Sequence, residues 1–160
     1  MHPSAQKVAN AARELGLDIE IVEFAQTTRT AQEAAAAIGC DVAQIVKSLC
    51  FTANGQPVVA LVSGTNQLDT RKLAGLSGVG RKKIKRANAD TVKAATGFSI
   101  GGVPPFGYKN PLPIYIDADL MDFDIVWAAA GTPFAVFAIK PDQLAKCSNG
   151  QIANLKSVSS

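Results

Sequence analysis

The dipeptide Asn54-Gly55 stands between two apolar segments, residues 48–52 and residues 57–63. Asparagine and glycine readily take the positive φ angles of a two-residue type I′ turn, so this pattern is a strong hairpin signal. We therefore expect an antiparallel strand pair over these two segments. The rest of the fold has to be built around that pair.

Helical and strand patterns follow one another along the rest of the chain. Thr30-Ala-Gln-Glu33 forms a capping box, Asp69 is a second N-cap, and Ser4 with Gly16 would bound the first helix. Helices are predicted over residues 4–15, 30–39, 69–76 and 89–96, and from Pro141 onward. Strands are predicted over residues 18–24, 112–117, 125–130 and 134–139. This order indicates an α+β fold, with a mixed sheet or partial barrel that carries surface helices.

The chain has 160 residues, of which 48% are hydrophobic and 18% are charged. This balance is opposite to that of disordered proteins, so we expect residues 1–156 to form a single domain and residues 157–160 to be a disordered tail. No apolar run approaches the roughly 18 residues of a membrane span. The first residues lack the long apolar core of a secretory signal. The sequence therefore predicts a cytoplasmic protein without a membrane partner.

Cysteine and histidine are too few for the commonest metal and catalytic sites. Cys40, Cys50 and Cys147 share no CxxC spacing, and His2 is the only histidine. Zinc would need further ligands, so we predict no metal site, no disulfide framework and no cofactor. A Ser-His-Asp or Cys-His arrangement needs a placed imidazole. Any chemistry in this protein must therefore proceed without histidine.

Charge is unevenly distributed over a chain whose formal net charge is only +3. Seven of the 16 Lys and Arg residues lie between residues 71 and 86, whereas acidic residues gather between residues 117 and 124. A local basic run predicts a face that meets polyanions. A solvated helix or loop surface is the alternative, and the run alone does not distinguish the two.

Lys47 is a lone charge among the apolar residues Ile45, Val46 and Leu49, where a helix gives way to a strand. A lysine in such surroundings commonly extends its ammonium group to the surface. The functional alternative is a cation at the mouth of a pocket, where a compact positive charge holds a phosphate or carboxyl group.

The segment Gly101–Gly107, GGVPPFG, is too rich in glycine and proline to be a regular element. Glycines let the backbone approach a ligand, and consecutive prolines stiffen the chain. The segment could be a rigid cradle of backbone donors, or an ordinary crossover between a helix and a strand. It matches neither the P-loop nor the dinucleotide-binding pattern.

Other polar residues could line a cavity, namely Ser48 and the pair Ser63-Gly64. Serine is common in strands, so these positions alone carry little information. Trp127 and Phe134 are predicted to be core aromatics.

Lys47 and the glycine-proline loop together give the chain a resemblance to a known family. The segments QIVKSLCF, PVVALVSG, DTRKLAGL, TGFSIGGVPPFG, LPIYID and VWAAAGTPFAVF resemble those of the YbaK/EbsC family. This family comprises aminoacyl-tRNA deacylases related to the editing domain of bacterial prolyl-tRNA synthetases. Residues 101–105 fit its GxxxP loop, and Val46-Lys-Ser-Leu49 fits the segment with its essential lysine.

The resemblance implies a mixed sheet curled into a partial barrel with surrounding helices. It also implies hydrolysis of the ester that joins a wrong amino acid to the 3′ end of a tRNA. Lys47 would grip the phosphate or ribose of the terminal adenosine, and the amides of Gly101, Gly102 and Val103 would orient and polarise the ester carbonyl. The predicted substrate-binding residues are Ser48, Ser63, Gly64, Pro104, Pro105 and Gly131. Because an aminoacyl ester is already reactive, positioning and a polar cradle can suffice without histidine.

The same resemblance bears on substrate and partners. The chain reads Ala129-Ala-Gly-Thr-Pro133 where cysteine-clearing members have an SAGKRG-like stretch, and it lacks the late histidine of some members. The amino acids that remain open are alanine, 2-aminobutyrate, serine, threonine and cysteine. Proline tRNA is the expected partner, with prolyl-tRNA synthetase as a further candidate and DNA excluded. The residues predicted to bind tRNA are Arg81, Lys82, Lys83 and Lys85.

Two other functions remain open on the residues alone. One is a non-catalytic module of the same fold that binds tRNA or a synthetase. The other is an unrelated small-molecule hydrolase that uses the same pocket. Retention of both the lysine and the loop argues against the first, and the basic face argues against the second.

Overall fold

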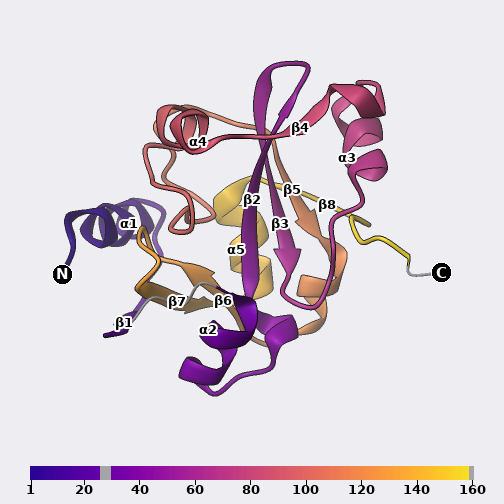
Figure 1. Cartoon of the computed structure of the whole chain (residues 1–160). Helices are drawn as coiled ribbons and strands as arrows, with labels where there is room; N and C mark the ends of the chain where they lie inside the picture. Colours follow the sequence, from indigo (N-terminus) through magenta and orange to yellow (C-terminus); the bar gives the residue numbers. More distant parts are fainter. Residues whose placement is uncertain (26–29, 159–160) are drawn as a thin grey trace.

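The structure, a computed structural model, describes residues 1–25 and 30–158 (Figure 1). It has an α+β fold, as predicted. Within the described residues the strands form a five-stranded and a three-stranded sheet. In Figure 1, α5 lies behind the long hairpin β2–β3, whereas α1 lies beside the smaller sheet.

The larger sheet is built on the predicted hairpin. β2 (Val46–Ala53) and β3 (Gln56–Ser63) pair antiparallel. Asn54 and Gly55 have φ angles of 51° and 83°, as a type I′ turn requires, so the hairpin is confirmed. The order in the sheet is β4-β2-β3-β5-β8, where β4 is Ile84–Arg86, β5 is Ile114–Asp117 and β8 is Gln151–Ala153. The sheet is mixed because β5 runs parallel to both β3 and β8.

The smaller sheet is antiparallel and has the order β1-β7-β6. Its strands are β1 (Ile21–Glu23), β7 (Ala135–Ile139) and β6 (Val126–Ala129). An isolated bridge between Ile45 and Trp127 connects it to the start of β2. Among the described residues the two sheets do not close into a barrel, so the predicted partial barrel is not confirmed.

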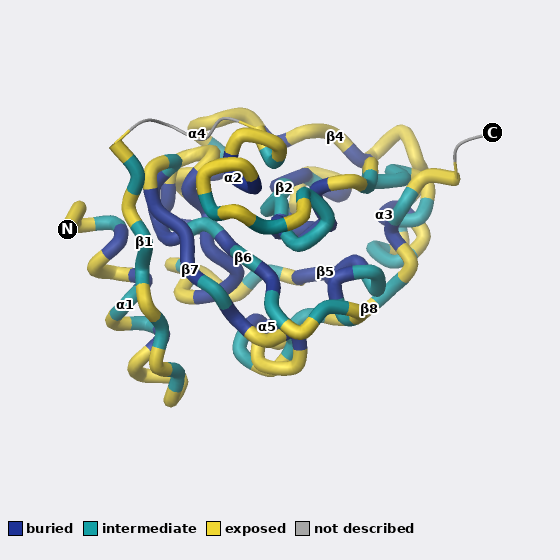
Figure 2. Tube along the Cα trace, turned by 90° about the horizontal axis from the view of Figure 1, so that it is seen from below, coloured by how far each residue is buried: buried dark blue, intermediate teal, exposed yellow. Residues whose placement is uncertain are grey.

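Apolar side chains cover both faces of the larger sheet. Consecutive residues of β3 are buried from Val58 to Ser63, and their side chains alternate between the two faces. Val59 and Leu61 belong to a core that includes strands β6 and β7, whereas Ala60 and Val62 belong to a second core with α3. Figure 2 shows this burial in dark blue along β7, β6 and β5. The first core therefore joins the two sheets.

The helices are α1 (Pro3–Glu14), α2 (Ala31–Ile38), α3 (Thr70–Ser77), α4 (Ala89–Thr96) and α5 (Pro141–Ser148). Thr30 and Asp69 cap α2 and α3, as predicted. The predicted cap Ser4 is wrong, because His2 Nδ1 accepts from the Ser4 amide and Pro3 is the first helical residue. Proline suits that position since its missing N–H would have no partner there. No helix in the described part of the chain is long and apolar enough to cross a membrane.

Short 3₁₀ helices complete the fold: η1 (Val42–Gln44), η2 (Arg81–Lys83) and η3 (Ala118–Asp122). The sequence did not predict β4 or β8, and the four other predicted strands are shorter than expected by one to four residues. Phe134, predicted to be a core aromatic, is 41% exposed. Of the predicted tail, residues 159–160 lie outside the described residues, and the Ser157 amide donates to the Gln67 carbonyl oxygen at 2.8 Å.

Candidate functional site

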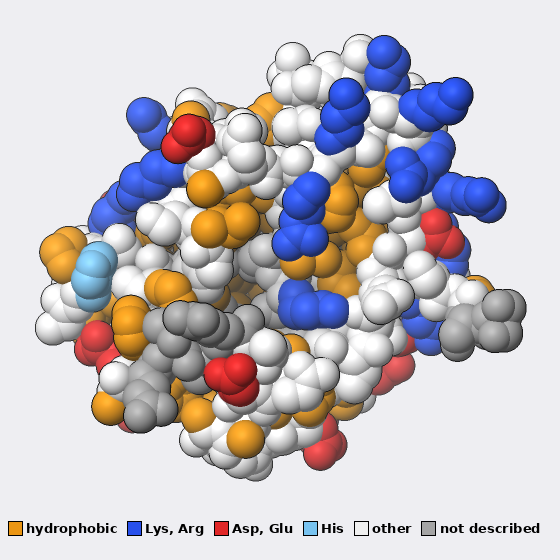
Figure 3. All heavy atoms as spheres, viewed as in Figure 1, with side chains coloured by type: hydrophobic (Ala, Val, Ile, Leu, Met, Phe, Trp, Pro, Cys, Tyr) orange, Lys and Arg blue, Asp and Glu red, His pale blue; other side chains and the backbone are white. Residues whose placement is uncertain are grey.

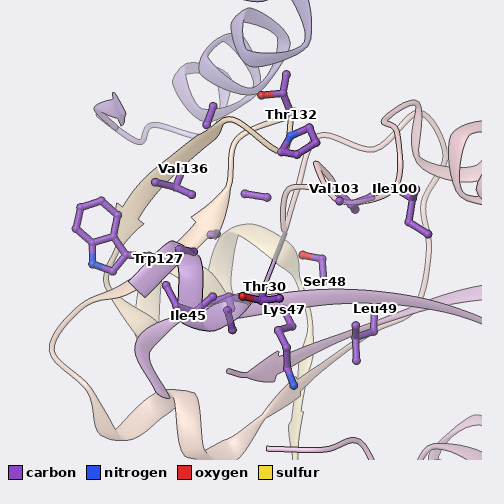
Figure 4. Close-up of a pocket in the computed structure, with 18 of the residues that line it drawn as sticks. Thr30, Ile45, Lys47, Ser48, Leu49, Ile100, Val103, Trp127, Thr132 and Val136 are labelled. Carbon is purple, nitrogen blue, oxygen red and sulfur yellow. The ribbon is translucent and has the colours of Figure 1, made fainter. Parts of the chain in front are cut away.

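A cavity of about 340 Å³ lies between the two sheets, beside the first half of β2. α2, β6 and β7 supply a wall of small apolar side chains, and the loop after α4 supplies the facing side (Figure 4). The wall consists of Ala31, Ala34, Ala128, Ala129, Ala135 and Val136. Ile45 and Trp127 line the cavity where the two sheets meet. Trp127 is thus half-buried at this site, and is not a plain core aromatic as predicted.

The edge of β2 is open where it borders the cavity. β4 pairs only with residues 51–53 of β2, and the Ala87 amide donates to the Cys50 carbonyl oxygen at 3.1 Å. Backbone groups alternate along a strand, so the N–H and C=O of Ser48 point to the same edge as that carbonyl. The Ser48 Oγ is shielded from solvent, and none of the described residues forms a hydrogen bond with it. Ser48 therefore has one free hydroxyl and two backbone groups at this edge of the cavity.

Lys47 lines the cavity from the other side of β2. Figure 4 shows Ser48 on the side of Val103 and the Lys47 amine on the opposite side, as the alternation of side chains along a strand requires. Lys47 Nζ donates to the Asn66 carbonyl oxygen at 2.5 Å. Burial lowers the pKa of Lys47, nearby Asp117 acts in the opposite direction, and Arg86 lowers it further. The ammonium has two further N–H donors for a ligand.

The loop residues Gly101 and Val103 line the cavity, but Gly102 does not. The Gly102 amide donates to the Ser99 carbonyl oxygen at 3.0 Å, and Gly101 has a φ of 89°. Residues 99–102 therefore form a type II turn, in which the third residue needs a positive φ. The predicted use of the Gly102 amide as a donor to substrate is wrong for this conformation, because the turn already occupies it. For the amides of Gly101 and Val103, no acceptor is recorded within the described residues.

Close backbone packing explains the glycine at position 102. A Cβ there would lie 2.7 Å from backbone atoms of Gly131 and Thr132. Gly131 in turn packs against the Ser4 carbonyl group in α1. Gly131 does not line the cavity, contrary to its predicted role, and it braces the loop from behind.

Four more of the predicted substrate-binding residues lie away from the cavity wall. Pro104 and Pro105 are buried and do not line the cavity. The Ser63 Oγ donates to the Ala43 carbonyl oxygen at 2.6 Å, so this hydroxyl is already paired. Gly64 packs against the carbonyl group of Val42 in η1. The prolines were predicted as part of the GxxxP loop, and Ser63 and Gly64 as residues at a strand end, but all four stabilise the fold.

The predicted tRNA-binding residues form an exposed basic surface. Arg81, Lys82 and Lys83 lie on η2, and Lys85 lies on β4. Figure 3 shows Lys and Arg side chains gathered at the upper right, over the region of α3 and β4, with others beside a hollow lined by hydrophobic side chains. This surface therefore shares a face of the molecule with that hollow.

Arg86 is a cavity residue that sequence reasoning missed. It follows the basic run on β4, lines the cavity, and holds its guanidinium 5.4 Å from the centre of the Phe51 ring. Its position at the end of a basic run gave a signal, but only the pairing of β4 with β2 brings it to Lys47. Two cations thus stand at one cavity. Its described lining residues include no carboxylate.

The cysteines Cys40, Cys50 and Cys147 are free thiols. The described residues contain no group of three or more His, Cys, Asp or Glu side chains that could hold a metal ion. The polar groups at the cavity are hydroxyl, amide, ammonium and guanidinium groups.

Comparison with known proteins identifies the family. The sequence model of the aminoacyl-tRNA editing domain family matches residues 25–147, and the chain belongs to this family. A relative from Enterococcus faecalis, named "Putative Cys-tRNA(Pro)/Cys-tRNA(Cys) deacylase EbsC", is 30% identical over 127 residues, which cover 79% of this chain and 76% of the relative. The resemblance to the YbaK/EbsC family is thereby confirmed.

Two further likenesses connect the chain to prolyl-tRNA synthetases. A crystal structure of "a putative trans-editing enzyme for prolyl tRNA synthetase" is 43% identical, has a TM-score of 0.93, and is matched over 99% of both chains. The proline–tRNA ligase of Elusimicrobium minutum is 36% identical over 122 residues, which are 76% of this chain and 21% of the ligase. The family is therefore one of aminoacyl-tRNA editing and deacylation of the prolyl-tRNA synthetase type.

Proposed function

We propose that this protein is a free-standing deacylase that hydrolyses the ester of a small mischarged amino acid on proline tRNA, and that residues 1–156 act as one editing domain. The observation that carries this proposal is the cavity of about 340 Å³. It combines a wall of alanine and valine, a Ser48 hydroxyl that no described residue pairs, and two cations on adjacent strands. This combination suits a ligand with a small side chain at one end and phosphates at the other.

Hydrolysis adds water across the ester, which releases the free amino acid and restores the ribose hydroxyl of the tRNA. The Gly101 and Val103 amides would donate to the carbonyl oxygen as it gains negative charge, and such preorganised donors are a large source of catalysis. Ser48 would hold the amino or ribose group through its hydroxyl and its open backbone edge. Lys47 and Arg86 would hold the phosphate of the terminal adenosine. The reaction then depends on position and polarity.

The cavity wall favours alanine and 2-aminobutyrate among the candidate amino acids. Thr30 and Thr132 also line the cavity, and their hydroxyl oxygens accept from the amides of Glu33 and Phe134 at 3.0 and 3.1 Å. The alanine side chains of the wall offer no hydrogen-bond partner to the hydroxyl or thiol of serine, threonine or cysteine. Because one methylene separates substrates by only about 10- to 200-fold in a hydrophobic pocket, neighbours in size should be cleared at graded rates.

The basic surface would bind the acceptor stem of the tRNA. Arg81, Lys82, Lys83 and Lys85 are exposed and continue along the chain to Arg86 at the cavity. A nucleic acid that ends in the cavity can pass over them, and phosphate contacts of this kind position a strand without reading its sequence.

The test is deacylation of proline tRNA charged in turn with alanine, 2-aminobutyrate, cysteine, serine, threonine and proline. We expect rapid loss of alanine or 2-aminobutyrate, sparing of proline, and at least a hundredfold lower rate in Lys47→Ala. Lys140→Ala, an exposed lysine outside the cavity, is the matched control and should retain the full rate.

The same experiment decides between this function and a binding module. Binding of the tRNA without hydrolysis of any ester would reject the deacylase and favour a non-catalytic module of the same fold. Hydrolysis that Lys47→Ala leaves unchanged would reject the assigned role of Lys47.

A further inference from the structure

A chain of hydrogen bonds that does not contact the proposed substrate ends on the ammonium group of Lys47. The Asn66 carbonyl oxygen accepts from Lys47 Nζ. The Asn66 side-chain amide Nδ2 donates to Asp117 Oδ2 at 2.8 Å and to Asp119 Oδ2 at 2.9 Å. The Asn66 backbone N–H donates to the Ser63 carbonyl oxygen at 2.9 Å. Asn66 is therefore fixed at its backbone and at its side chain.

Asp117 is a buried anion in this chain, with only 1% of its surface exposed. Its carboxylate accepts from the Ser63 amide at 3.0 Å, from Asn66 Nδ2 at 2.8 Å and from the Asp119 amide at 3.0 Å. Within the described residues, no Lys or Arg forms an ion pair with it. The field of a buried carboxylate extends to nearby cations, and here it favours the charged form of Lys47 against the effect of burial.

The segment around Asn66 is held by the C-terminal part of the chain, residues 155–157. The Asp69 amide donates to the Leu155 carbonyl oxygen at 2.7 Å, and the Ser157 amide donates to the Gln67 carbonyl oxygen at 2.8 Å. Lys156 Nζ lies 3.0 Å from Asp119 Oδ2, and hydrogen bonds from Asn66 and Lys156 lower the pKa of Asp119. These contacts brace both the loop and the second carboxylate that anchors Asn66.

A lysine ammonium on a flexible four-carbon chain loses much rotamer freedom when a ligand fixes it. If a carbonyl oxygen already holds the ammonium in the free protein, less rotamer freedom is lost on binding. This requires that the carbonyl group itself is fixed in place. One N–H donor is occupied by Asn66, and two are left for a phosphate.

We propose that Asn66 is a positioning residue, which fixes its own carbonyl oxygen through Asp117 and Asp119 and thereby fixes the position of the Lys47 ammonium beside the cavity. This inference rests on the proposed function, since it gives Lys47 a substrate to hold. Asn66 touches Lys47 and not the substrate, so it acts on the reaction only through that lysine.

The first measurement is the order of the Lys47 side chain in the absence of tRNA. Carbon-13 relaxation of its Cε, assigned by loss of the signal in Lys47→Arg, would be compared among wild type, Asn66→Ala and Asn154→Ala. Asn154 accepts from Lys72 Nζ in the same C-terminal region, and it is not among the described partners of Asn66, so it is the matched control. We expect the Lys47 Cε order parameter to fall in Asn66→Ala and to stay at the wild-type value in Asn154→Ala.

The second measurement is kcat/KM for deacylation by the same three proteins. We expect a decrease of about tenfold for Asn66→Ala and a change below about twofold for Asn154→Ala. If Asn66→Ala fails to fold, Asp119→Ala replaces it. Asp119 is one of the two anchors, and its side chain is 37% exposed. Asp119→Ala should produce a smaller loss of both order and kcat/KM.

An unchanged Lys47 order parameter in Asn66→Ala would overturn the proposal, whatever the activity. A wild-type protein that deacylates no charged tRNA would reject the proposed function, and the relaxation comparison would still decide whether Asn66 positions Lys47. Equal losses of kcat/KM in Asn66→Ala and Asn154→Ala would assign Asn66 a purely structural role.

Discussion

Substitution of Gly102 by alanine should destabilise the protein because three backbone segments meet at this position. The new Cβ would lie 2.7 Å from Gly131 and Thr132 backbone atoms, about 0.7 Å short of ordinary contact. Gly131 cannot retreat, since the Ser4 carbonyl group of α1 packs behind it. Overpacking of this kind costs about 2–3 kcal/mol, which for a chain of this size lowers Tm by about 4–12 °C.

The assay is urea unfolding followed by the fluorescence of Trp127, the only tryptophan, which lines the cavity. Gly101→Ala is one control: its positive φ of 89° strains an alanine, but its nearest neighbour is Pro133 at 3.7 Å, so we expect a loss of about 1 kcal/mol. Gly75→Ala is the other: apart from the backbone of its own helix and its chain neighbours, none of the described residues has an atom within 4 Å of the added Cβ, so we expect a gain of about 0.5–1 kcal/mol. If Gly102→Ala is as stable as wild type or Gly101→Ala, the packing argument is refuted.

Three further predictions concern single features of the site and the core. Tyr108→Phe removes a buried hydroxyl that has no hydrogen-bond partner among the described residues, so urea titration should show about 1 kcal/mol of added stability; a loss would contradict this. Burial lowers the pKa of Lys47. The catalysed rate, corrected for spontaneous hydrolysis, should therefore fall as Lys47 loses its proton, at a pH below the usual lysine pKa of about 10.4. A constant rate up to that pH would count against a charged Lys47. Joint replacement of Lys82, Lys83 and Lys85 by alanine should reduce the slope of log KM against log salt concentration by about 2–3. An unchanged slope would show that these residues form an ordinary solvated surface and do not bind tRNA.

Local chemistry made much of the fold predictable. Asn54-Gly55, Thr30 and Asp69 act on residues within four positions of themselves, so turn and cap patterns reveal them. β8 (Gln151–Ala153) could not be found in this way. It has three residues, two of them exposed, and it becomes a strand because α5 returns the chain to the edge of β5. β4 is likewise short and was hidden within a basic run.

The site residues that could be predicted are those that lie in a recognisable short segment, either around Lys47 or in the glycine-proline loop. Lys47, Ser48, Gly101 and Val103 were all singled out from the sequence, and the structure brings them to one cavity. The assignment of a donor role to the Gly102 amide required the turn type, which depends on the φ of the neighbouring residue.

The rest of the cavity depends on tertiary contacts. Arg86 and the alanine wall come from β4, α2, β6 and β7, which are adjacent only in space. No periodicity or motif links these elements, so their assembly could not be inferred from the sequence.

The position of the cavity at the junction of the two sheets has a consequence for what determines its width. One wall belongs to the smaller sheet and the opposite edge to β2, and these meet at the bridge between Ile45 and Trp127. The width of the cavity therefore depends on how the two sheets pack against each other. Buried side chains of the core that joins the sheets, such as Leu61 and Phe137, set this spacing although they do not line the cavity. Substitutions in that core are therefore expected to change the width of the cavity without contacting what it holds.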